Sequence, residues 1–160
     1  MTLSRREIVM MLPALAAAHA ADGAQSTPSA PPLQAAPAAQ GPQTTPLPAK
    51  VYHSAAIPYK GNETKKARRF FYGPEHSGYL LEMHETVLGP GVETHALHSH
   101  PHQEIIIVIE GAVQVSMDGN TDTAEAGSVI FYEPNKPHNL RNAGTVPCRY
   151  YVVELRGPTR

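Results

Sequence analysis

The sequence predicts an all-β protein, a sandwich or barrel built from many short strands. Three observations support this prediction. Beyond Lys50 the chain contains short runs rich in Val, Ile and Tyr, residues that favour strands. Gly, Pro, Asn and Asp interrupt these runs where turns would be needed. No stretch after residue 60 has the 3.6-residue apolar period of an amphipathic helix.

The first expected strand is Tyr79 to Leu88, whose side chains alternate between a mostly apolar face and a more polar one. Residues two apart lie on the same side of a strand. His84 belongs to the more polar face, so we expect it to be solvated. Gly89-Pro90-Gly91 then predicts a turn.

A β-branched run from Glu104 to Glu110 predicts the next strand, and Gly111 separates it from another at Ala112 to Met117. Asp118-Gly119-Asn120 has the composition of a hairpin turn. Residues 105–109 are apolar on both faces, so we expect burial on both sides. One side would line the barrel interior and a second copy of the chain would cover the other, which predicts a homodimer.

Further short strands between turn residues fit 121–125, 128–132, 138–142 and 149–155. The one cysteine, Cys148, excludes an internal disulfide framework and a cysteine-based zinc cluster. We interpret it as a small buried apolar residue near the start of a strand. A reactive or intermolecular thiol is the alternative.

The first 20 residues have the organisation of an export signal. Arg5 and Arg6 precede an apolar run, residues 8–18, which is shorter than the roughly 20 apolar residues that span a bilayer. Ala18-His19-Ala20 fits the small-residue cleavage pattern, and the paired arginines resemble a twin-arginine signal. We therefore expect an exported, periplasmic or extracellular protein without stable membrane insertion. An amphipathic helix of the folded domain is the alternative.

Composition divides the rest of the chain. Residues 21–50 are rich in Pro and Ala and almost uncharged, which predicts a disordered linker because so little apolar area can be buried there. Residues 51–160 form the predicted β-barrel domain, with a core at about 65–157. The 13 basic and 14 acidic residues nearly balance, so nothing favours a nucleic-acid partner.

Histidines cluster before the β-branched run. His98 and His100 are two apart and should point to the same side of an extended chain. Glu104 has the same parity, and His138 begins another expected strand and can add a third nitrogen. Such a mixed N/O set suits a divalent transition metal with open coordination positions. We interpret His102 as a surface loop residue, with a spare ligand or proton shuttle as the alternative.

At these residues the sequence resembles the cupin family. Its first motif, G-x5-H-x-H-x3,4-E-x6-G, is matched in spacing by His98, His100, Glu104 and Gly111, although Gly91 lies one residue too far from His98. The resemblance covers roughly residues 65 to 157.

The family's second motif, G-x5-P-x-G-x2-H-x3-N, is matched in spacing by Gly127, His138 and Asn142. Glu133 stands in place of its proline and Asn135 in place of its second glycine. Asn tolerates positive φ, so the turn can persist.

The resemblance implies a single jelly-roll β-barrel with one divalent metal held by His98, His100, Glu104 and His138. The twin-arginine-like signal would allow metal loading before export, which favours Mn or Fe over Zn, Ni or Cu. A barrel that keeps these residues but binds no metal is the alternative.

The fold itself does not decide the activity. We expect a metalloenzyme, of dioxygenase, isomerase or lyase type, that acts on a small organic molecule. A non-catalytic module that binds metal or a small ligand is the alternative, and a purely structural dimerising domain is a third. No general base can be assigned, although Glu93, Tyr132 and Tyr150 are candidates to line a pocket.

Overall fold

The computed structural model describes residues 45–157. The predicted signal peptide, residues 1–20, and most of the predicted linker, residues 21–50, lie outside the described residues. At the end of the linker range, the backbone N–H of Leu47 donates to the carbonyl oxygen of Pro74 at 2.8 Å. Within residues 45–157, no helix has the length and apolar character needed to cross a membrane.

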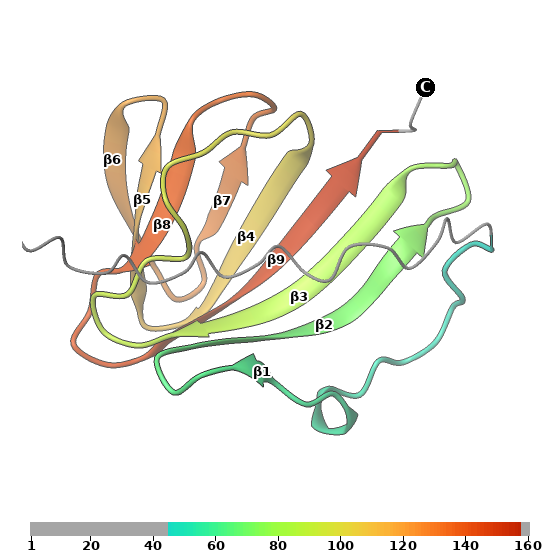
Figure 1. Cartoon of the computed structure of the whole chain (residues 1–160), viewed down its shortest axis with the longest axis horizontal. Coiled ribbons are helices and arrows are strands. Elements are labelled where there is room, and N and C mark those ends of the chain that lie inside the picture. The colour runs from blue at the N-terminus through green and yellow to red at the C-terminus, as the bar shows by residue number, and fades with distance from the viewer. Residues whose placement is uncertain (1–44, 158–160) are drawn as a thin grey trace, which may run out of the picture. The chain divides into compact units, whose positions relative to one another are not determined.

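The described residues form two antiparallel sheets (Figure 1). The larger sheet has the strand order β1-β2-β3-β9-β4-β7, and the smaller has the order β6-β5-β8. A short 3₁₀ helix, η1 (Ser54–Ala56), precedes them. The strands are β1 (Lys60–Gly61), β2 (Lys65–Pro74), β3 (Leu80–Leu88), β4 (Gln103–Glu110), β5 (Ala112–Met117), β6 (Asn120–Glu125), β7 (Val129–Tyr132), β8 (His138–Asn142) and β9 (Cys148–Arg156).

The apolar core lies between the two sheets, and each contributes one face to it. The core side chains are all at most 6% exposed. The larger sheet supplies Leu88, Ile106, Val108, Ile130, Tyr132, Cys148, Tyr150 and Val152, and the smaller supplies Val113, Val115 and Leu140. The fold therefore confirms the all-β jelly-roll prediction and the buried position of Cys148 at the start of β9.

One long strand, β2, was not predicted. Its sequence begins with charged residues and shows no clear alternation, because a register irregularity lies between Arg69 and Phe71 in its pairing with β3. A bulge of this kind interrupts the two-residue period by which a strand is recognised in a sequence. β2 is recognised as a strand by its hydrogen-bonded pairing with β3 and not by an apolar pattern in its sequence.

One expectation about a strand face was wrong, and the other, burial of the β4 run by a second copy, is not tested by a single chain. The more polar face of β3 points inward: Glu82, Thr86 and Leu88 are all at most 6% exposed. The outer face of the β4 run is not covered, since Ile105 is 38% exposed and Phe131 beside it on β7 is 51% exposed. The homodimer that would cover this face stays a prediction.

Two turns confirm the backbone reasoning. Gly111 has φ of 76°, and a Cβ at this position would lie 2.9 Å from the Cβ of Cys148, so glycine is required both for conformation and for space. Asn135 adopts φ of 61°, as expected for an asparagine that replaces a motif glycine.

A buried carboxylate anchors the segment before β2 to the outer face of the larger sheet. Glu85 of β3 is 0% exposed and accepts hydrogen bonds from Tyr59 Oη at 2.9 Å, Arg68 Nε at 2.6 Å and Arg149 at 3.2 Å. Arg149 also binds the exposed Glu110. These five residues form the Glu85 ion-pair network, in which two guanidinium groups balance two carboxylates.

Stability is expected to fall in acid because of this network. Burial alone would raise the pKa of Glu85, but hydrogen bonds from Arg68, Tyr59 and Arg149 outweigh it and hold the pKa below its usual 4.5. The unfolded chain therefore binds the proton more readily, so the stabilisation present at neutral pH is lost as the pH falls below 4.5 through the folded-state pKa. Urea unfolding measured from neutral pH to about pH 3 checks this. A free energy of unfolding that stays constant below pH 4.5 would contradict it.

Candidate metal centre

The loop between β3 and β4 lies along β8 like an additional strand (Figure 1). The backbone N–H of Thr94 donates to Leu140 O at 2.9 Å. Further along the loop, His98 and His138 exchange backbone hydrogen bonds, at 3.1 Å from the His98 N–H and 2.8 Å from the His138 N–H. This antiparallel bridge places the side chain of His98 next to that of His138, although 40 residues separate them in the sequence.

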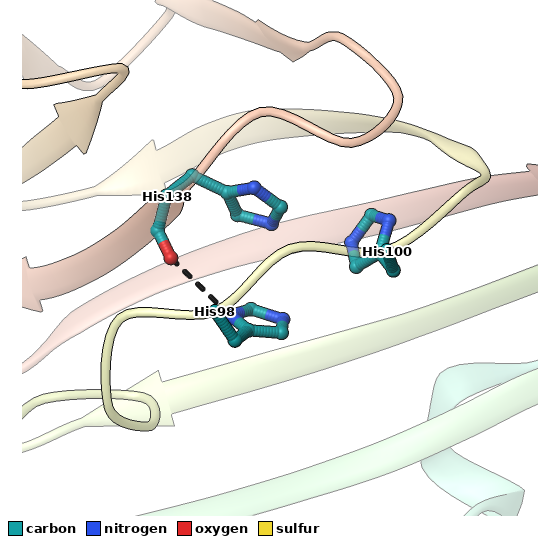
Figure 2. A group of neighbouring side chains, drawn as sticks. All are labelled: His98, His100 and His138. Atoms are coloured by element: carbon teal, nitrogen blue, oxygen red, sulfur yellow. Dashed lines mark hydrogen bonds between the residues drawn. The ribbon is translucent and has the colours of Figure 1, made fainter.

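Three imidazole rings gather at this bridge. Figure 2 shows His98 and His100 from the loop and His138 from the start of β8, with a dashed line from His98 to the carbonyl oxygen of His138. Ring centroids are 5.4 Å apart for His98 and His100, 4.6 Å for His98 and His138, and 4.7 Å for His100 and His138. One nitrogen from each ring lies within 4.8 Å of the others. One ion can therefore be reached by all three.

Hydrogen bonds to backbone carbonyl groups determine which nitrogen of each neutral ring carries the proton. Nδ1 of His98 lies 3.2 Å from His138 O, Nδ1 of His100 lies 2.9 Å from His102 O, and Nδ1 of His138 lies 2.8 Å from Lys136 O. A carbonyl oxygen only accepts, so each Nδ1–H donates. In the neutral tautomer the Nε2 lone pair is then free to bind a cation.

His138 gives the sharpest indication that a cation fits. The residue is 1% exposed, and its Nε2 is buried without a hydrogen-bond partner. An unpartnered buried polar atom costs about 1–3 kcal/mol. Burial lowers the pKa of His138, so the ring is neutral near pH 7 and presents a lone pair rather than a proton. A divalent cation would satisfy this atom.

Glu104 lies beside His100, with 3.2 Å between Oε2 and Nε2. Burial would raise the pKa of Glu104, but His100 outweighs it and the pKa lies below the usual value. The carboxylate in turn raises the pKa of His100. The ligand atoms of His100, His102 and Glu104 form a second group within 4.8 Å of one another.

His102 is not the surface residue that the sequence suggested. Its side chain is 13% exposed, and its ring stacks on that of His100 with centroids 3.6 Å apart and planes 4° from parallel. Nε2 lies 3.0 Å from Oε2 of Glu154. Burial, together with His100 and Arg156, lowers the pKa of His102 to about 4, so this ring is also neutral at pH 7.

A row of carboxylates continues from the centre across the inner face of the larger sheet. The register places Glu82 of β3 opposite Glu154 of β9, and Glu154 opposite Glu104 of β4. Arg69 Nε donates to Glu82 at 2.9 Å, and Arg156 lies 2.5 Å from Glu154 and 3.5 Å from Glu82. Burial raises the pKa of Glu154, and Arg156 offsets only part of that effect.

The comparisons with known proteins agree with this architecture. Residues 84–154 match the family model described as a cupin domain. An RmlC-like cupin from Shewanella frigidimarina superposes with a TM-score of 0.56 and 18% identity, covering 66% of this chain and 88% of that one. The fold is a cupin jelly roll. Together the family match and the superposition support an assignment to the cupin superfamily.

Other proteins similar to this chain have different descriptions. The polyketide cyclase RemF from Streptomyces resistomycificus has a TM-score of 0.56 and 22% identity over 69% of this chain and 83% of that one. A predicted oxalate decarboxylase from Thermotoga maritima has a TM-score of 0.56 and 19% identity, over 68% and 100%. An uncharacterized protein of Methanocaldococcus jannaschii is 26% identical over 101 residues, 62% of this chain and 80% of that protein.

Within the cupin fold, three of the four predicted ligands, His98, His100 and His138, form one group, and the fourth, Glu104, contacts this group through His100. Tyr132 stacks on His138 with centroids 4.1 Å apart, and the two border a surface hollow of about 250 Å³. Of the other two predicted pocket residues, Tyr150 lies in the core at 1% exposure. Glu93 is exposed and forms a backbone β-bridge with Arg141 of β8.

Sequence reasoning missed three members of the site's surroundings, Glu82, His102 and Glu154. The parity of His102 with His98 and His100 was the available signal for one of them. The other two are charged residues on strand faces that turn inward, and only the pairing of β3, β9 and β4 shows this.

Proposed function

We propose that this cupin domain binds one divalent transition metal through His98, His100, Glu104 and His138, and that it uses the ion to bind or transform a small organic molecule. The observation that supports this best is the buried, unpartnered Nε2 of His138 among two further imidazoles. Burying these polar atoms without hydrogen-bond partners would cost free energy of folding unless a cation binds them.

The donor set favours a metal that accepts both nitrogen and oxygen. Three imidazole nitrogens and one carboxylate suit Mn, Fe, Zn, Ni or Cu, and the carboxylate favours the harder ions among them. Four protein ligands leave positions free on a six-coordinate ion. A bound metal would supply Lewis-acid polarisation of a substrate oxygen there.

The residues around the proposed metal centre orient its ligands and shield them from water. The backbone bridge between His98 and His138 orients two rings, and the carbonyls of His138, His102 and Lys136 hold the three Nδ1 protons. Tyr132 packs against His138 and excludes water from that side. Glu82 and Glu154, each paired with an arginine, add carboxylate groups beside the centre, and Glu154 contacts His102.

An enzyme and a non-catalytic binding module remain the two candidate functions, with the enzyme preferred because the centre has open coordination positions. The two described neighbours, a polyketide cyclase and a predicted oxalate decarboxylase, indicate that this fold hosts chemically unlike reactions. Export to the periplasm or beyond, and assembly as a homodimer, are part of the proposal.

The test is metal analysis by mass spectrometry of protein exported through its own signal and dialysed exhaustively. We expect close to one equivalent of Mn or Fe, and loss of retained metal in the variant with His98→Ala and His138→Ala. The matched control replaces two exposed histidines, His53→Ala and His76→Ala, and should keep the metal. Absence of metal from the parent protein would overturn the proposal.

Metal-loaded protein would then be screened against small phenols, sugars and organic acids, with and without oxygen. Turnover would favour the enzyme, and binding without turnover the module.

A further inference from the structure

We propose that His102, held in place by Glu154, is a positioning residue that fixes the ring of the metal ligand His100. The inference rests on the proposed metal site and concerns what orients one of its ligands. His102 itself stays outside the ligand set, because its ring lies parallel to that of His100, with planes 4° apart, and two parallel stacked rings do not direct their lone pairs at one ion.

The ring of His100 is the one that the backbone bridge does not orient. His98 and His138 exchange two backbone hydrogen bonds, and Nδ1 of His98 lies 3.2 Å from the carbonyl oxygen of His138. His100 lies further along the loop, outside this bridge (Figure 2). Its carbonyl oxygen accepts from the backbone N–H of Asn135 at 2.7 Å, which holds the main chain but leaves the side-chain torsions free. Another group must therefore fix its ring.

His102 contacts the ring of His100 in two ways. The two rings stack with centroids 3.6 Å apart, which fixes the plane of the His100 imidazole. The carbonyl oxygen of His102 accepts from Nδ1–H of His100 at 2.9 Å, which fixes the tautomer. With both contacts in place, Nε2 of His100 is the nitrogen left for a cation. Such outer contacts orient the ring of a ligating histidine before the ion arrives.

Glu154 in turn holds the ring of His102. Nε2 of His102 lies 3.0 Å from Oε2 of Glu154, and since a carboxylate only accepts, Nε2–H donates. The two side chains are 13% and 12% exposed, so little water competes for this bond. Arg156 lies 2.5 Å from the same carboxylate and holds it from the other side. Hydrogen bonds with an ionised partner are the stronger ones.

The sheet register explains why the two rings stack. Glu154 of β9 lies directly opposite Glu104 of β4, and neighbouring strands are about 4.8 Å apart. His100 lies 3.2 Å from Glu104, and His102 lies 3.0 Å from Glu154. Two carboxylates on adjacent strands thus hold two imidazoles side by side. One pair supplies proposed ligands, and the other supports them.

The experiment compares Mn²⁺ and Zn²⁺ affinities, measured by calorimetric titration of metal-free protein, for the parent, His102→Ala and His102→Phe. Alanine removes both the stacked ring and the contact with Glu154, whereas phenylalanine restores a ring that can stack on His100. We expect His102→Ala to weaken the binding of both metals about ten-fold or more, and His102→Phe to recover part of the loss. The control is His76→Ala, an exposed histidine between β2 and β3, which should bind as the parent does.

A second readout separates positioning from a general effect on folding. Co²⁺ accepts the same nitrogen and oxygen ligands, and its visible absorption spectrum reports their geometry. We expect the Co²⁺ spectrum of His102→Ala to differ from that of the parent, and the spectrum of His102→Phe to lie between them. Urea unfolding of the three metal-free proteins shows how much stability each change costs.

Parent-like affinities in His102→Ala would overturn the inference. So would a lower free energy of unfolding with an unchanged Co²⁺ spectrum, because that is the result of a purely structural role. Equal losses in the alanine and phenylalanine variants would overturn the role of the stacked ring. If His102→Ala does not fold by circular dichroism, Glu154→Ala replaces it, with the same expected loss and the same contrary results. A parent protein that binds neither metal would instead refute the proposed function.

Discussion

Replacing Glu85 by glutamine is expected to lower the free energy of unfolding by about 3–5 kcal/mol, the cost of breaking a buried ion pair by removing one partner. Glu85 is 0% exposed and joins two arginines and Tyr59. Without its charge, Arg68, whose side chain is 13% exposed, would face a neutral amide in a largely dehydrated place. Equilibrium urea unfolding measures the loss.

Glu110→Gln is the matched control, because Glu110 binds the same Arg149 but its side chain is 62% exposed. Exposed pairs contribute about 0–1 kcal/mol, so this variant should unfold almost as the parent does. Similar losses in the two variants would show that the Glu85 network does not depend on its buried carboxylate.

His100→Ala is expected to weaken metal binding more than replacement of any other single ligand. His100 lies in the group with His98 and His138, and its Nε2 is 3.2 Å from Glu104, so its loss removes a nitrogen donor and the contact that orients the carboxylate. Structural zinc sites with four protein ligands bind with about 10–16 kcal/mol, so one ligand is worth roughly 2.5–4 kcal/mol, or about 70- to 1000-fold in affinity. Calorimetric titration with Mn²⁺ and with Zn²⁺ measures the effect.

The control for this prediction is His53→Ala, an exposed histidine before η1. It should bind both ions as the parent does. Because His100 contacts the buried carboxylate of Glu104, urea unfolding of the metal-free variant is measured as well, to separate a loss of stability from a loss of the metal ligand. Parent-like affinity in His100→Ala would contradict the centre described above.

The strands from Leu80 onward were predictable because turn residues bound them and most of them, such as β4 and β5, have β-branched or alternating apolar residues. Gly111 and Asn135 adopt the positive φ values that their places in the motifs implied. The gathering of His98, His100 and His138 was also predictable, since parity and spacing constrain which side chains share a face.

The features that the sequence did not predict depend on pairing between strands that are distant in the sequence. β2 has no period to recognise, because its irregularity beside Arg69 shifts the register. Glu82 and Glu154 point inward although they are charged, and the residues before β2 cover part of the outer face, where Tyr59 bonds Glu85 and Arg68 bonds Ser54 O. Sequence spacing alone does not reveal which face of these strands points toward the core.

The bridge between His98 and His138 joins two segments 40 residues apart, so an ion held there would act as a reversible cross-link across the domain. A ligand that binds the native state alone adds about 2.7 kcal/mol to its stability at 100 times the dissociation constant. The fraction of unfolded, protease-sensitive molecules would then fall about 100-fold when metal is plentiful. The lifetime of the protein would thus follow the metal supply of its surroundings.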